Sequence, residues 1–114
     1  MKPHNFLYIL SDQHQRMASG AYGHPVVQTP HLDALAARGT RFQNAYTNCP
    51  ICVPARASLA TGRYVHQIGN WDNGHPYDGT VFSWHQRLRE QGFRCNSIGK
   101  LHFDTGDIAG QPLR

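Results

Sequence analysis

The sequence has few charged residues and no long apolar run. Asp, Glu, Lys and Arg make up 16% of its 114 residues, against roughly 25% in typical soluble domains, so we expect further chain to cover part of this surface. No apolar run approaches the ~18 residues that a membrane span needs, and the N-terminus has no signal peptide. These absences predict a cytoplasmic protein without a membrane partner, and the length allows one domain at most.

The chain is basic, with 11 basic against seven acidic residues, but only Lys2 and Lys100 are lysines. The planar fork of arginine suits phosphate, sulfate or carboxylate. The arginines are scattered and no nucleic-acid-binding motif is present, so we expect an anionic ligand and no nucleic-acid partner. Three cysteines cannot all pair within the chain, which favours free thiols, a metal site or a modified residue over a disulfide framework.

The apolar pattern predicts alternating strands and helices. Strands are expected at residues 5–10, 41–47 and 93–98. Helices are expected from Pro30 to a stop at Gly39, from Pro54 to Gly62, and after a capping box at 83–86. The order strand, helix, strand, helix, helix, strand favours an α/β layered fold with a parallel sheet flanked by helices. Chemistry collects at the carboxyl ends of such strands, where Asp12 and Lys100 lie.

Cys49 and Cys52 form a C-x-x-C pair. One interpretation is a thioredoxin-like redox pair; another is half of a zinc site that Cys95 and a histidine would complete. We interpret Cys49 instead as a small buried hydrophobe. Cys52 lies at or just before a helix N-terminus, where free N–H groups and the helix dipole favour an anion. Arg56, one turn further along the same face, adds a fixed positive charge.

The string from Cys52 to Arg63, with its C-x-P-x-R core, resembles the modification signature of the sulfatase family in the alkaline-phosphatase-like superfamily. Three further segments resemble the family in the same order. Residues 8–12 resemble its first strand and metal-binding acid, residues 29–42 its T-P-N-L-D-x-L-A…G…F stretch, and residues 98–102 its G-K-W-H segment. The resemblance covers residues 5 to about 103.

The resemblance implies the N-terminal part of an alkaline-phosphatase-like fold and a hydrolase acting on sulfate esters. A maturation enzyme would oxidise Cys52 to formylglycine, whose hydrate attacks the sulfur and displaces the alcohol. A divalent metal would lower the pKa of that hydrate and hold the sulfate oxygens. Oxygen ligands make Ca²⁺ the first choice, with Mg²⁺ or Mn²⁺ next.

Carried over residue by residue, the resemblance assigns six positions. Asp12, Gln13 and the modified Cys52 would be metal ligands, Arg56 would stabilise the ionised hydrate, and Lys100 and His102 would contact the formylglycine and the sulfate group. Taken singly, Asp12 could be a turn former, Lys100 a solvated charge and His102 a loop histidine.

The sequence departs from the family pattern in two ways. Gln13 stands where many members have a second acid, which keeps a phosphonate or phosphate ester hydrolase of the same superfamily as an alternative. Members are also several times longer, so we expect residues 1–114 to be the N-terminal segment of a sulfatase catalytic domain, inactive without the remainder of the polypeptide. A non-catalytic Cys/His metal-binding or redox module is the alternative from another class.

Overall fold

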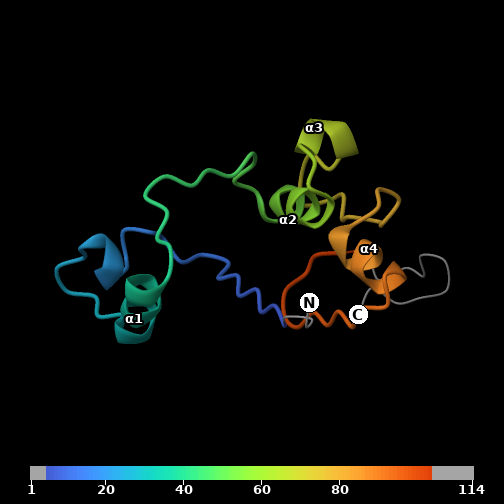
Figure 1. Ribbon diagram of the computed structural model, residues 1–114. Coiled ribbons are helices and arrows are strands. Elements are labelled where there is room, and N and C mark those ends of the chain that lie inside the picture. The colour runs from blue at the N-terminus through green and yellow to red at the C-terminus, as the bar shows by residue number, and fades with distance from the viewer. Residues whose placement is uncertain (1–4, 104–114) are drawn as a thin grey trace. The chain divides into compact units, whose positions relative to one another are not determined.

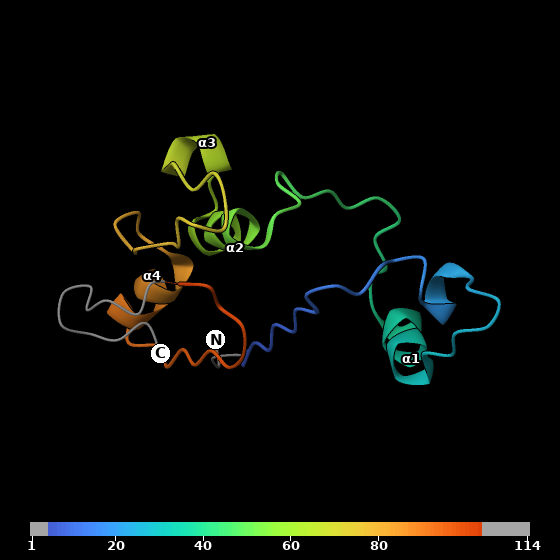
Figure 2. The ribbon, with the colours of Figure 1, turned by 180° about the vertical axis from the view of Figure 1, so that it is seen from behind.

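The computed structural model describes residues 5–103 of the chain, which divides into unit 1 (Met1–Ala45) and unit 2 (Tyr46–Arg114). Figure 1 and Figure 2 show the elements of both units from opposite sides. Regular structure within the described range is helical, with one isolated parallel bridge between Tyr77 and Phe103. The elements are η1 (Gly20–Tyr22), α1 (Pro30–Arg38), α2 (Cys52–Thr61), α3 (Val65–Ile68) and α4 (Trp84–Glu90).

In unit 1, η1 and α1 are joined through Thr29. The Thr29 hydroxyl accepts a hydrogen bond from the Gly20 N–H at 2.9 Å and donates one to Asp33 Oδ1 at 2.7 Å. A Cβ at Gly20 would lie 2.5 Å from Asp33 Oδ2, so a larger residue there would displace the Asp33 carboxylate. Helix α1 starts at Pro30 and ends before Gly39, as predicted. Its predicted apolar face remains open, because Leu32 and Leu35 are about half exposed.

The three predicted strands, 5–10, 41–47 and 93–98, do not form within the described residues. The first of them leaves Phe6, Leu7 and Ile9 about four-fifths exposed. A strand forms its backbone hydrogen bonds only by pairing with a neighbouring strand. It buries its apolar side chains only by packing against another layer. Neither partner is present for these segments in residues 5–103, so the central sheet stays a prediction.

Unit 2 has a small hydrophobic core around α2. Ala57, Ala60 and Tyr77 are at most 1% exposed. Helix α2 packs against α3 and α4, and the two ribbon views agree on this arrangement (Figure 1; Figure 2). The core is completed by three partly buried side chains, those of Ile68, Val81 and Phe103. The small alanine side chains let the neighbouring segments approach α2 closely.

The predicted end of α2 and the predicted start of α4 are confirmed, but α2 begins at Cys52, two residues before the predicted start at Pro54. Its last residue is Thr61, and Gly62 follows as the C-cap with a left-handed φ of 69°. Helix α4 begins after the capping box: Ser83 Oγ accepts from the Gln86 N–H, and Gln86 Oε1 accepts from the Ser83 N–H. The short helix α3 was not predicted.

No helix between residues 5 and 103 combines the length and apolar character that crossing a membrane requires.

Candidate functional site

Cys52 is the first residue of α2 and is partly exposed, at the start of a helix that is buried along one face. Ile51 before it is extended, with φ −97° and ψ 139°, and its carbonyl accepts from the Ala55 N–H at 2.9 Å. The next two residues, Val53 and Pro54, are buried. The packing of α2 therefore fixes the backbone that carries Cys52 and leaves the thiol at the surface of unit 2.

The segment before α2 is tied to the helix by polar contacts. Asn48 Nδ2 donates to the Ser58 hydroxyl at 2.5 Å, and that hydroxyl donates to the Arg63 carbonyl at 2.6 Å. Cys49 is 9% exposed, which confirms its interpretation as a small buried side chain. Cys49, Cys52 and Cys95 are all free thiols.

One predicted site residue, Lys100, meets Cys52 at this end of α2, and a second, Arg56, contacts Lys100. Lys100 Nζ lies 3.9 Å from Cys52 Sγ, and Arg56 Nη1 donates to the Lys100 carbonyl at 2.5 Å. The Arg56 contact fixes the backbone of Lys100, whose ammonium then reaches the sulfur across 48 residues of sequence. The Lys100 ammonium and the positive end of the helix dipole thus lie at one thiol, and Arg56 holds the Lys100 backbone from one turn further along α2. Such an arrangement stabilises negative charge on an atom at this position and attracts an anion.

His102 lies two residues beyond Lys100 in an unusual backbone conformation. Its φ of 57° is the one positive φ of a non-glycine residue among those the structure describes. Its Nδ1 is buried without a hydrogen-bond partner in that part of the chain. Backbone strain and an unsatisfied buried nitrogen both cost free energy and both cluster at functional sites. No hydrogen bond recorded in the structure joins His102 to Cys52, so its catalytic role stays a prediction.

Phe103, next to His102, is anchored in the core of unit 2. Its ring meets Tyr77 edge-on with centroids 5.2 Å apart, and meets His85 in the same way at 5.9 Å. Burial raises the pKa of the Tyr77 hydroxyl above 10.0, so this group stays protonated and donates to the Val81 carbonyl. Lys100 and His102 are therefore held between two anchors, Arg56 on one side and Phe103 on the other.

Asp12 and Gln13 lie in unit 1, in a bend that follows the exposed segment 5–10, and both side chains are exposed. Their predicted joint role with Cys52 involves both units and stays a prediction. The described residues contain no group of three or more His, Cys, Asp or Glu side chains able to hold a metal ion. Unit 2 by itself does not fit a divalent cation at Cys52, because the side chain that meets the sulfur there, Lys100, is cationic.

The absence of such a group in residues 5–103 also removes support for a zinc site built from Cys49, Cys52, Cys95 and histidines. The residue that sequence reasoning missed is Asn73, whose Oδ1 accepts from the Val53 N–H at 3.0 Å. Its surroundings are rich in Gly, Asn and Asp, which is typical of a turn-rich loop, and nothing in this local pattern indicates a contact with a helix twenty residues earlier.

Comparisons with known proteins identify relatives of the chain. The sulfatase family model matches residues 4–109. The chain is 37% identical over 110 residues to an uncharacterized sulfatase, YidJ, of Escherichia coli K12, covering 96% of this chain and 22% of that protein. It is 33% identical over 105 residues to human arylsulfatase K, covering 92% and 20%. It is also 33% identical over 98 residues to an N-acetylglucosamine-6-O-sulfatase of Bacteroides thetaiotaomicron, covering 86% and 18%. The chain thus spans about a fifth of the length of these relatives.

Proposed function

Because this chain belongs to the sulfatase family, we propose that it supplies the nucleophile of a sulfuric ester hydrolase, and that Cys52 is that nucleophile after conversion to formylglycine. The family generally depends on formylglycine and a metal. We propose further that the chain is the N-terminal segment of the catalytic domain and that it is inactive without the rest of the enzyme.

The observation that carries the proposal is the approach of Lys100 Nζ to Cys52 Sγ at 3.9 Å, with Arg56 bound to the Lys100 carbonyl. Sγ in this structure marks the atom that modification replaces with oxygen. A sulfate ester brings negative charge to this point, and the hydrate oxygen must itself become anionic to attack. Lys100 and Arg56 stabilise both charges, and because packing and hydrogen bonds hold them in place, little reorganisation accompanies the reaction.

His102 is proposed to contact the sulfate group beside Lys100. Its position after Lys100, the strained φ of 57° and the unpartnered Nδ1 support this role. A histidine at this place can donate a hydrogen bond to a sulfate oxygen or move a proton to the departing alcohol.

Asp12 and Gln13 are proposed as oxygen donors for the metal. A carboxylate and an amide oxygen are ligands that suit Ca²⁺ first, then Mg²⁺ or Mn²⁺. When bound, the metal would add positive charge that holds the sulfate oxygens. The donor types of Asp12 and Gln13 support the assignment, and further ligands would come from other residues of the complete enzyme.

A phosphonate or phosphate ester hydrolase is the second candidate, and Gln13 is the residue that favours it. With an amide in place of a second carboxylate, the metal site carries one negative charge less than in many family members. A less anionic site penalises a doubly charged phosphate group less strongly. The sulfate-ester activity remains the first proposal because the curated relatives named above carry sulfatase names.

The test uses the full natural protein that contains this chain, made in a host that installs formylglycine. Trypsin releases residues 42–56, and fragment masses within this peptide separate Cys52 from Cys49. We expect an aldehyde at residue 52 and metal-dependent hydrolysis of an aryl sulfate. Parallel assays on phosphonate and phosphate esters decide between the two candidate substrates.

Cys52→Ala should lower the activity to background, and Cys95→Ala is the matched control, because Cys95 is a partly buried free thiol outside the signature. Full activity in Cys52→Ala would overturn the proposal, as would turnover by the Cys52 thiol form alone. Activity of the isolated 114-residue chain would contradict the proposed need for the rest of the enzyme.

A further inference from the structure

The first turn of α2 has no side-chain cap of its own. The residue before the helix is Ile51, which has no polar side-chain atom, and the structure shows no cap hydrogen bond from it. The first N–H groups of a helix have no partner within the helix. Pro54 removes one of them because proline has no N–H, and the Ala55 N–H already donates to the Ile51 carbonyl. The Val53 N–H is left to find an acceptor elsewhere.

Asn73 supplies that acceptor. Its Oδ1 lies 3.0 Å from the Val53 nitrogen. Because a backbone N–H can only donate, the amide oxygen of Asn73 must face the helix, and the assignment of oxygen and nitrogen in this side chain follows. Val53 is 4% exposed, so water has little access to replace the bond. A buried N–H without a partner costs about 1–3 kcal/mol.

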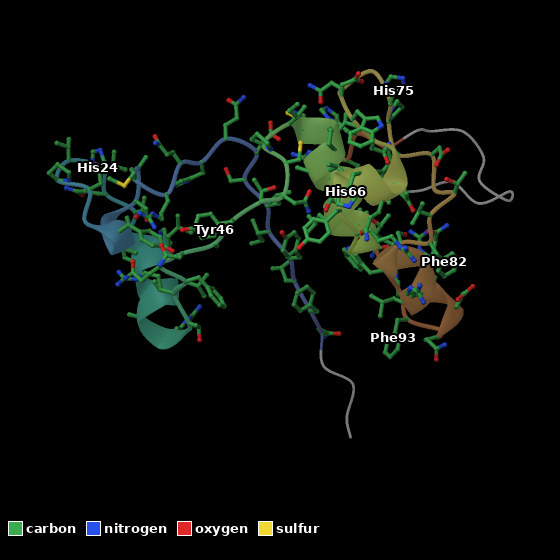
Figure 3. All side chains as sticks on the ribbon, turned by 90° about the horizontal axis from the view of Figure 1, so that it is seen from above. His24, Tyr46, His66, His75, Phe82 and Phe93 are labelled. Carbon is green, nitrogen blue, oxygen red and sulfur yellow. The ribbon has the colours of Figure 1, made fainter. Side chains whose placement is uncertain are left out.

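The loop that carries Asn73 is closed by its own contacts. Asn70, which is 8% exposed, donates from Nδ2 to the His75 carbonyl at 2.9 Å. Asp72 Oδ1 accepts from the Gly74 N–H at 2.8 Å and pairs with His75 Nδ1 at 2.7 Å. His75 marks this loop in Figure 3. Residue 73 lies at the tip of a turn whose two sides are fastened together, so its side chain is presented to α2 at a low entropic cost.

The bond from Asn73 controls the residue before Val53 through the peptide plane. Cys52 and Val53 share one planar peptide unit, so the direction of the Val53 N–H sets the ψ angle of Cys52. That ψ angle and the χ1 of Cys52 together set the direction of Sγ, or of the oxygen that would replace it. In this structure Sγ lies 3.9 Å from Lys100 Nζ. Misplacement of a reacting atom by about 1 Å costs on the order of 100-fold in rate.

We propose that Asn73 is a positioning residue for the nucleophile: its side-chain oxygen fixes the first turn of α2 and so holds residue 52 toward Lys100. This inference rests on the proposed function of Cys52 as nucleophile. It assigns a role to the 70–76 loop that neither the signature nor the charge pattern of the sequence indicates.

The kinetic test compares three variants of the full, modified enzyme. Asn73→Leu has nearly the same size but no acceptor, Asn73→Asp keeps the oxygen, and Asn96→Leu is the control at another exposed asparagine of unit 2. We expect kcat to fall by about 10- to 100-fold in Asn73→Leu with KM changed less than about twofold. Asn73→Asp should keep most of the activity, since a carboxylate caps a helix as well as an amide. A dead Asn73→Asp variant would show that the NH₂ group is needed, and would overturn the positioning role.

An exchange measurement on the 114-residue chain separates this inference from the proposed function. Hydrogen exchange of the Val53 amide, followed by NMR, should accelerate about tenfold in Asn73→Leu and stay within about twofold of the parent in Asn73→Asp and Asn96→Leu. Protected amides in α4 would show that the variant is folded. Unchanged exchange at Val53 in a folded Asn73→Leu chain would overturn the inference, whatever the activity of the enzyme.

Discussion

Unit 2 buries Tyr77 and Ala57 almost completely, whereas unit 1 leaves Phe6, Leu7 and Ile9 about four-fifths exposed. The difference follows from the kind of structure each sequence specifies. Helices satisfy their backbone groups internally, so α2, α3 and α4 need only a few side-chain contacts to gather around a core. The apolar segment of unit 1 is a strand pattern, and its backbone and side chains both need partners.

The comparison explains why one half of the predicted site takes shape and the other does not. Lys100 reaches Cys52 and Arg56 reaches Lys100 through contacts inside unit 2. Asp12 and Gln13 are exposed and follow segment 5–10, which forms no strand within the described residues. The nucleophile half of the site depends on local packing, and the metal half depends on the sheet.

The largest effect is expected at the centre of unit 2. Tyr77→Ala removes a ring that is 1% exposed and should lower the stability of unit 2 by about 3–5 kcal/mol, the range for large aromatic side chains lost from a core. Denaturant unfolding of the 114-residue chain, followed by circular dichroism, measures the change. Tyr46→Ala is the matched control at a tyrosine that is 90% exposed, and equal losses in the two variants would break the comparison.

The capping box of α4 should have the next largest effect. Ser83 is 1% exposed and exchanges hydrogen bonds with Gln86, whose Oε1 accepts from the Ser83 N–H at 2.7 Å. Ser83→Ala should cost about 1–2 kcal/mol, at the upper end for a lost N-cap, because the site is buried. Exposed Ser11→Ala in unit 1 is the control. Hydrogen exchange of the α4 amides measures the loss, and unchanged protection would contradict the assigned cap.

The sequence predicted those elements whose signals are local. Pro30, Gly62 and the Ser83–Gln86 pair mark helix ends through proline geometry, a left-handed glycine and capping, and the helices form where these signals lie. Gly39 follows the end of α1 with an extended backbone, φ −126° and ψ −159°. The position of Cys52 at a helix N-terminus followed from the same reasoning. Contacts over long sequence distances were different: the resemblance to sulfatases placed Lys100 near Cys52, but the contact of Asn73 with Val53 has no sequence signal.

Lowering the pH should lower the stability of unit 2 through protonation of His85. Burial, with a smaller contribution from the Arg89 charge, lowers the pKa of His85 below its usual value of 6.5. The unfolded chain therefore binds a proton more readily, and stability falls as the pH drops through 6.5 toward the folded-state pKa. His85→Phe, which retains the ring beside Trp84 and Phe103, should flatten unfolding curves measured from about pH 8 to about pH 5. His66→Phe is the control at an exposed histidine, and an unaltered slope in His85→Phe would refute the assignment.

The smallest effect is expected in unit 1, and it tests the comparison most directly. Ile9 is 80% exposed, so Ile9→Ala should change the stability of the 114-residue chain by less than about 0.5 kcal/mol. In the full natural protein the same substitution should cost about 2–5 kcal/mol if segment 5–10 becomes a buried strand of the predicted sheet. Val53→Ala, at a side chain that is 4% exposed, should be destabilising in both. A large loss from Ile9→Ala in the short chain would mean that the segment already packs there. Equal small losses in both proteins would remove the predicted strand, and with it the reason to expect Asp12 and Gln13 at the edge of a sheet.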